Sequence, residues 1–161
     1  MQTIEKNRTV NVGADKVLAV LTDPVLEVER NKRVNEAVDC EYKEVEENDE
    51  QLIYELHCTE YARGIKGINK SKTEVNIYKY TWNLKEKFAK WEYHLSSWKN
   101  KVKVNGTVNL KDNGDSTDII NKINISIGIP LVGKKIEKMI KKEISDSWHL
   151  YDEYIDDKLG K

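Results

Sequence analysis

The hydrophobic residues of this chain follow two different periods, and the changes between them divide the sequence into three regions. Residues 3–12 alternate apolar with polar positions and predict a strand, whereas residues 14–21 switch to the spacing of a helix. The residue before Pro24 is disfavoured in the α region, so this helix is expected to end there. Residues 25–33 are predicted to form a second short helix.

From residue 38 to residue 127 the apolar period is two, which is typical of antiparallel strands with one wet face. Polar, turn-forming residues at 47–49, 85–87, 99–100 and 112–115 separate the alternating sets. The six sets are Val38, Cys40 and Tyr42; Leu52, Tyr54, Leu56 and Cys58; Tyr78, Tyr80, Trp82 and Leu84; Ala89, Trp91, Tyr93 and Leu95; Val102, Val104, Val108 and Leu110; and Ile119, Ile123, Ile125 and Ile127. Together with the first strand, they predict a sheet of about seven strands.

The last region, from Pro130 to Lys158, returns to a helical period. On a wheel of about 100° per residue, its apolar and charged residues separate onto two faces. The apolar face carries Ile136, Met139, Ile140, Ile144, Trp148, Leu150, Tyr151, Tyr154, Ile155 and Leu159. A helix of roughly 40 Å, at about 1.5 Å per residue, requires a large apolar partner surface, which the predicted sheet supplies. The sequence therefore predicts an α+β fold in which a curved antiparallel sheet surrounds a long C-terminal helix, with one or two short helices after the first strand.

This order of elements is the helix-grip order, and two segments carry a resemblance to a known superfamily. Residues 13–24 (GADKVLAVLTDP) and residues 127–137 (IGIPLVGKKIE) are similar to START-like (SRPBCC) proteins, which include polyketide cyclases, pollen-allergen-type proteins and lipid-transfer domains. The second segment resembles a bacterial branch of uncharacterised function. The resemblance implies a single helix-grip domain over residues 1–161, with a ligand-sized cavity between sheet and helix. It implies no particular reaction.

Composition and charge narrow the class of protein. The 161 residues, 39% hydrophobic and 34% charged, suit one globular domain with a sizeable core. A net charge of −1 argues against a nucleic-acid-binding protein held by a basic surface. Residues 1–12 contain no signal-peptide core, and no apolar run approaches the roughly 20 residues of a membrane span. We therefore expect a cytoplasmic protein.

If the alternating apolar sets face the helix, aromatic rings gather on the inner face of the sheet. Tyr80 is then expected opposite Trp91 or one step from it, and Tyr78 near Tyr93. Gly106 is expected beside Tyr93, where a missing side chain leaves space for a ring or a ligand. Apolar pockets with few polar groups are typical of small-molecule sites, although the same rings are consistent with a filled core. The cavity wall is predicted to include Tyr78, Tyr80, Trp91, Tyr93, Gly106, Asn121, Ile123, Ile140, Ser147 and Tyr151.

Three polar residues interrupt the inward-facing positions, where an unpaired polar group costs on the order of 1–3 kcal/mol. Asn121 lies in the isoleucine row of the last strand, and Ser147 and Glu143 lie on or at the edge of the apolar helix face. They are candidates to orient the polar end of a ligand. Ser147 can alternatively bond a carbonyl of its own helix, and Glu143 can reach solvent. We favour the solvent-facing role for Glu143 and leave the other two open.

Cysteines, histidines and lysines add little chemistry. Cys40 and Cys58 are expected opposite each other on a hairpin, close enough for a disulfide or a shared metal, but two reduced thiols are favoured without export. The three histidines show no metal-ligand spacing, and there is no glycine-rich phosphate loop, so we predict neither a metal nor a cofactor. Lysines at 134–142 are suited to peripheral contact with anionic lipid headgroups, but acidic residues further along favour a solvated face.

Three functions fit these features. The first is binding or carriage of a small hydrophobic ligand, lipid-like or aromatic. The second is an enzyme of cyclase, aromatase or hydratase type, in which Tyr78, Tyr93, Asn121 or Glu143 would polarise or deprotonate a substrate. The third is a protein-interaction module with a collapsed core, in which residues 61–72, predicted to be a mobile loop near the cavity mouth, would form an exposed apolar patch. Binding is the favoured hypothesis.

Overall fold

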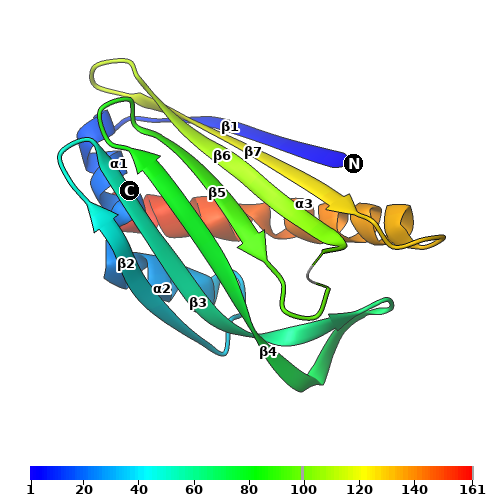
Figure 1. The fold of residues 1–161 in the computed structure, drawn as a ribbon. Helices are drawn as coiled ribbons and strands as arrows, with labels where there is room; N and C mark the ends of the chain where they lie inside the picture. Colours follow the sequence, from blue (N-terminus) through cyan, green and yellow to red (C-terminus); the bar gives the residue numbers. More distant parts are fainter. Residues whose placement is uncertain (99, 161) are drawn as a thin grey trace.

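The computed structural model describes residues 1–98 and 100–160, in which a seven-stranded sheet curves around one long helix (Figure 1). The strands are β1 (Gln2–Val10), β2 (Asp39–Glu47), β3 (Gln51–Gly64), β4 (Gly67–Asn83), β5 (Phe88–His94), β6 (Val102–Asp112) and β7 (Thr117–Ile127), and the helices are α1 (Ala14–Thr22), α2 (Pro24–Arg33) and α3 (Gly133–Lys158). Neighbouring strands are antiparallel throughout, in the order β1-β7-β6-β5-β4-β3-β2. The predicted helix-grip α+β fold is confirmed. The turn expected at residues 99–100 includes Lys99, which lies outside the described residues.

Strands β1 and β2 are consecutive strands in the sequence, but they form the two opposite edges of the sheet. Helices α1 and α2 carry the chain from one edge to the other and lie at the end of the sheet where α3 ends (Figure 1). The Asp23 side chain accepts hydrogen bonds from the backbone N–H groups of Val25 and Leu26, at 2.9 and 3.1 Å, and so caps α2. Helix α3 runs across the inner side of the sheet.

The β3–β4 hairpin extends beyond the other strands as an arm, which we define as residues 61–75 (Figure 1). Backbone pairing continues along the arm to Gly64 and Gly67, which flank its turn. The predicted loop at residues 61–72 is therefore wrong. The period-two signal fades here because the arm has no buried face against which apolar residues would alternate.

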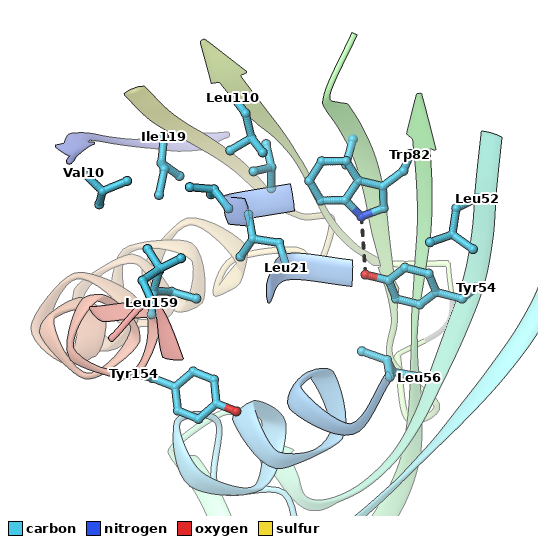
Figure 2. Packing of buried hydrophobic residues seen from close by; sticks show 14 of the residues in the cluster. Val10, Leu21, Leu52, Tyr54, Leu56, Trp82, Leu110, Ile119, Tyr154 and Leu159 are labelled. Atoms are coloured by element: carbon cyan, nitrogen blue, oxygen red, sulfur yellow. Dashed lines mark hydrogen bonds between the residues drawn. The ribbon is translucent and has the colours of Figure 1, made fainter. Parts of the chain in front are cut away.

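The hydrophobic core is divided into two clusters, one at each end of α3. The cluster at the C-terminal end joins α3 to α1 and to the sheet, and Figure 2 shows its packing. Its most deeply buried members include Val10, Val17, Tyr54, Leu56, Trp82, Ile119 and Ile155. The cluster at the N-terminal end joins Ile136 to isoleucines of β1 and β7, which are Ile4, Ile123, Ile125 and Ile127. The middle of α3, from Ile140 to Tyr151, is half-buried or exposed, and its apolar residues pack only partly against the two clusters.

Gly106 lies where the sheet backbone and an aromatic ring come closest. It pairs with Trp91, whereas Tyr93 pairs with Val104, so the predicted position of Gly106 beside Tyr93 is wrong by two residues along β5. A Cβ atom at Gly106 would lie 2.6 Å from the Trp91 ring and 2.4 Å from the carbonyl oxygen of Lys122. The Trp91 ring, and not free space, therefore takes the volume that the missing side chain leaves.

We expect Gly106→Ala to lower the free energy of unfolding by about 1–3 kcal/mol, because the added methyl group overlaps both a ring and a backbone carbonyl. Urea denaturation followed by tryptophan fluorescence measures the loss. Gly128→Ala is the matched control, since its added Cβ would meet nothing closer than 3.6 Å. Equal stability of the two variants would contradict the close packing of Trp91 against β6.

Candidate functional site

A cavity of about 480 Å³ lies between the sheet, α2 and the middle of α3. Residues predicted to line such a cavity are found in its wall, namely Tyr78, Tyr80, Trp91, Tyr93, Asn121, Ile123, Ile140, Ser147 and Tyr151. Gly106 is not part of the wall, because the Trp91 ring covers it. Ligand binding by these residues remains a prediction at this point.

Aromatic rings from the neighbouring strands β4 and β5 form one wall of the cavity. Tyr42, Tyr54 and Tyr80 stack in succession across β2, β3 and β4, with 5.0 Å between adjacent ring centroids. Tyr80 lies opposite Trp91 and Tyr78 opposite Tyr93, within the range that the hairpin geometry predicted. The Tyr78 and Tyr93 ring centroids are 4.5 Å apart. These rings present flat apolar surfaces of the kind that bind aromatic or polycyclic molecules.

The carboxylate of Glu60 lies in this aromatic wall and accepts three hydrogen bonds. Tyr93 donates to Oε1 at 2.7 Å, Asn76 donates to the same oxygen at 2.9 Å, and Tyr78 donates to Oε2 at 3.2 Å. Burial, followed by the negative charge of Glu60, raises the pKa of Tyr78 and of Tyr93 well above the usual value, so both stay protonated as donors. We call Glu60, Asn76, Tyr78 and Tyr93 the Glu60 cluster.

Glu60 was not predicted as a site residue, although the sequence contains a signal for it. Glu60 continues the same period-two phase as Leu56 and Cys58, and its strand keeps that phase facing inward. Asn76 is likewise in phase with Tyr78 on β4 and is 1% exposed. A charged residue in an inward register marks a position that the fold must satisfy with partners. The strand register of Glu60 and Asn76 therefore predicts a buried polar site here, whereas their residue types alone would predict exposure.

A second polar group links α2 to the sheet at the other side of the cavity. Arg30 donates to both carboxylate oxygens of Glu27, at 3.1 and 3.2 Å, and Tyr54 donates to Oε2 at 3.0 Å. The Trp82 ring N–H in turn donates to the Tyr54 hydroxyl (Figure 2). Glu27 and Arg30 are buried, and their spacing of three residues on α2 brings both to the face that meets the sheet. The guanidinium of Arg30 also lies 5.5 Å from the centre of the Tyr151 ring on α3.

Arg63 and Glu143 form an ion pair between the arm and α3, and both line the cavity. Arg63 donates from both of its terminal nitrogens, one of them at 3.4 Å from Glu143 Oε1. The Glu143 side chain is 41% exposed, so it reaches solvent as expected but is also paired. The Ser147 hydroxyl donates to the Glu143 carbonyl at 3.0 Å, which is the local helix bond that the sequence left open. Asn121 is buried in the cavity wall.

Cys40 and Cys58 lie directly opposite each other on β2 and β3, as predicted, and both are buried free thiols. Their sulfur atoms are 2.7 Å apart. Hydrogen bonding to Cys40, together with burial, raises the pKa of the Cys58 thiol. Within residues 1–98 and 100–160, no group of three or more His, Cys, Asp or Glu side chains is arranged to hold a metal ion.

Comparison with known proteins places this fold and cavity in a family. Residues 5–159 match the model of a family described as a protein of unknown function (DUF2505). The chain belongs to the DUF2505 family. No curated protein matches its sequence, and no helix in the described part of this DUF2505 protein is long and apolar enough to cross a membrane.

Solved structures of the START and cyclase type share the fold of the DUF2505 protein at low identity. A Streptomyces aromatase/cyclase, ZhuI, is 12% identical with a TM-score of 0.64, and the match covers 99% of this chain and 93% of that one. Norcoclaurine synthase from Thalictrum flavum is 13% identical with a TM-score of 0.60, covering 97% and 84%. A START superfamily protein from Mycobacterium smegmatis is 14% identical with a TM-score of 0.53, covering 98% and 93%. These similarities establish the START-like fold that the sequence predicted.

Removing one partner of the buried Glu27–Arg30 pair is expected to destabilise the DUF2505 protein strongly. We expect Glu27→Ala to lower the free energy of unfolding by about 3–5 kcal/mol, because it leaves the Arg30 charge buried without its carboxylate. Chemical denaturation measures the effect. Glu29→Ala, which removes the half-exposed ion pairs of Glu29 with Arg33 and Lys158, is the control on the same helix and should cost much less. A similar loss in both variants would show that α2 helicity, and not the buried charge, is responsible.

The buried tyrosines predict a loss of stability at alkaline pH. Burial raises the pKa of Tyr154 to about 12 and that of Tyr54 well above its usual value. In the unfolded chain tyrosines ionise near pH 10, so above about pH 10 the unfolded state binds fewer protons and becomes favoured. The stabilisation is complete below about pH 10 and declines as pH rises through the folded-state values. The denaturation midpoint should fall over this pH range while the tyrosinate absorbance rises. Full ionisation of the tyrosines without unfolding would refute the burial of these hydroxyl groups.

Proposed function

We propose that this DUF2505 protein binds a small, largely aromatic or polycyclic molecule in the cavity between its sheet and α3. The observation that carries the proposal is the cavity itself, about 480 Å³ in volume and lined in large part by aromatic rings. Small-molecule sites are usually preformed cavities of roughly 300–1,000 Å³ with apolar walls and a few converging polar groups. The Glu60 cluster supplies such polar groups.

The fold neighbours support a ligand of this kind. The Thalictrum norcoclaurine synthase was solved with dopamine and hydroxybenzaldehyde bound, both small aromatic molecules, and the Streptomyces protein is an aromatase/cyclase. The division of the core into two clusters supports the proposal from the physical side, because the apolar side chains in the middle of α3 are only partly buried and line the cavity. A collapsed-core interaction module is disfavoured for the same reason.

An enzyme of cyclase type is the second candidate, and one observation favours it. Glu60 is an inward carboxylate hydrogen-bonded to two tyrosines, and such chemistry needs a positioned acid or base. The raised pKa values of Tyr78 and Tyr93 leave neither hydroxyl ready to release a proton near neutral pH. Ligand binding therefore accounts for the geometry without requiring an acid or base that exchanges protons near neutral pH, as catalysis would.

Filling the cavity tests the proposal. We expect the purified wild-type protein to carry, or to take up, small aromatic molecules detectable by native mass spectrometry. Ser147→Trp should reduce that uptake by about tenfold or more, because Ser147 lines the cavity and an indole ring would occupy it. His149→Trp places the same ring on the exposed side of α3 and should leave uptake unchanged.

Uptake that is equal in both variants, or undetectable in the wild-type protein across a panel of aromatic compounds, would count against a ligand in this cavity. The two variants should have matching circular dichroism spectra, so that a difference in uptake reports the cavity and not a loss of folding.

A further inference from the structure

The charged residues in the cavity wall do not balance. Four carboxylates line the cavity, those of Glu27, Glu36, Glu60 and Glu143, against two guanidinium groups, those of Arg30 and Arg63. Glu27 is paired with Arg30 and Glu143 with Arg63. Glu36 is exposed, which leaves the Glu60 carboxylate as the charge within the aromatic wall that these pairs do not neutralise.

Every hydrogen-bond partner of Glu60 is a neutral donor. Its three bonds come from one amide and two phenol groups, and in the described part of the chain no Lys, Arg or His side chain lies within ion-pair distance of its oxygens. A carboxylate offers about four acceptor positions on its two oxygens. Oε1 accepts two of the bonds and Oε2 one, so Oε2 retains capacity for another donor.

The aromatic rings around Glu60 favour a positively charged donor in the cavity. Tyr78 and Tyr93 bond Glu60 directly, and Tyr80 and Trp91 form the next pair along the same two strands. The faces of aromatic rings carry negative potential and attract ammonium groups, by about 0.5–2 kcal/mol per contact. An aromatic wall that contains an unneutralised carboxylate is suited to a cation, whereas it disfavours an anionic group.

We propose that the ligand of this cavity is an amine that is protonated at neutral pH and attached to an aromatic body, with its ammonium group donating to Glu60. The proposal rests on the proposed function, because it assigns the ligand class of the same cavity. The aromatic body lies against Tyr80 and Trp91, and the ammonium group completes the hydrogen bonding of the carboxylate. The ion pairs of Arg30 and Arg63 leave the cavity without a free cationic group for a ligand carboxylate among the described residues.

Three probes that share one ring system test this assignment: tryptamine, its neutral alcohol analogue tryptophol, and the anion indole-3-propionate. Isothermal titration calorimetry at neutral pH gives their affinities for the full chain. We expect tryptamine to bind about 10- to 100-fold more tightly than tryptophol, the range of a hydrogen bond to a charged group. Indole-3-propionate should bind most weakly.

Glu60→Gln keeps an acceptor for the neighbouring phenols and removes the charge. It should cost tryptamine most of its advantage and change the affinity for tryptophol by no more than about threefold. Glu55→Gln is the matched control, since it removes the same charge from the opposite face of β3. If Glu60→Gln does not fold, the comparison of tryptamine with tryptophol on the wild-type chain still decides the question.

The outcomes separate the two proposals. Tryptophol binding as tightly as tryptamine would overturn the amine assignment and leave aromatic-ligand binding intact. A tryptamine preference that survives in Glu60→Gln would also overturn it, because the selectivity would then come from elsewhere. Binding of none of the three probes would overturn the amine assignment and count against the proposed function as well.

Discussion

Helix α3 is packed against the sheet at its two ends, and the rest of the architecture follows from that constraint. The helix has 26 residues, and the sheet curves around it (Figure 1). Ile136 anchors one end among the isoleucines of β1 and β7, and Tyr154 and Ile155 anchor the other end near α1 and α2. Between these anchors the inner side chains of α3, from Ile140 to Tyr151, are only partly buried and border the cavity.

Two ion pairs lie at the borders of the cavity. Glu27 and Arg30 connect α2 to β3 through Tyr54, and Arg63 and Glu143 connect the arm to α3. In each pair the two charges neutralise each other, so these residues stabilise the borders of the cavity but leave the charge of Glu60 without a counter-ion. The Glu60 cluster differs, because its donors are neutral and its charge stays with the cavity.

Much of the fold could be predicted because its signals are local and periodic. The alternation of apolar residues located the strands of the sheet, and the distance from each turn gave the Tyr80–Trp91 and Cys40–Cys58 pairs correctly. The Gly106 pairing was wrong because the β5–β6 connection is not a simple hairpin turn, so counting from it shifted the register. The arm was missed because a hairpin with two wet faces shows no alternation.

The candidate site was harder to predict than the fold, since its charged residues contradict the usual link between charge and exposure. Glu27 and Arg30 are buried on α2, while Val25 of the same helix is 72% exposed. The assumption that the apolar residues of a helix are the buried ones would therefore assign the wrong face of α2 to the core. Their burial depends on partners from distant strands, which a helical wheel does not contain. Glu60 was detectable from its strand phase alone, and register is the better guide when it disagrees with residue type.

The gap between the two core clusters also gives a bound molecule a structural role. A ligand in the cavity would bridge the two clusters and act as the missing middle of the core. By thermodynamic linkage, a ligand at about 100 times its dissociation constant adds about 2.7 kcal/mol to the stability of the folded state. The amount of folded protein would then depend on the concentration of its ligand. The free energy of binding would set both the occupancy of the cavity and the fraction of the protein that stays folded.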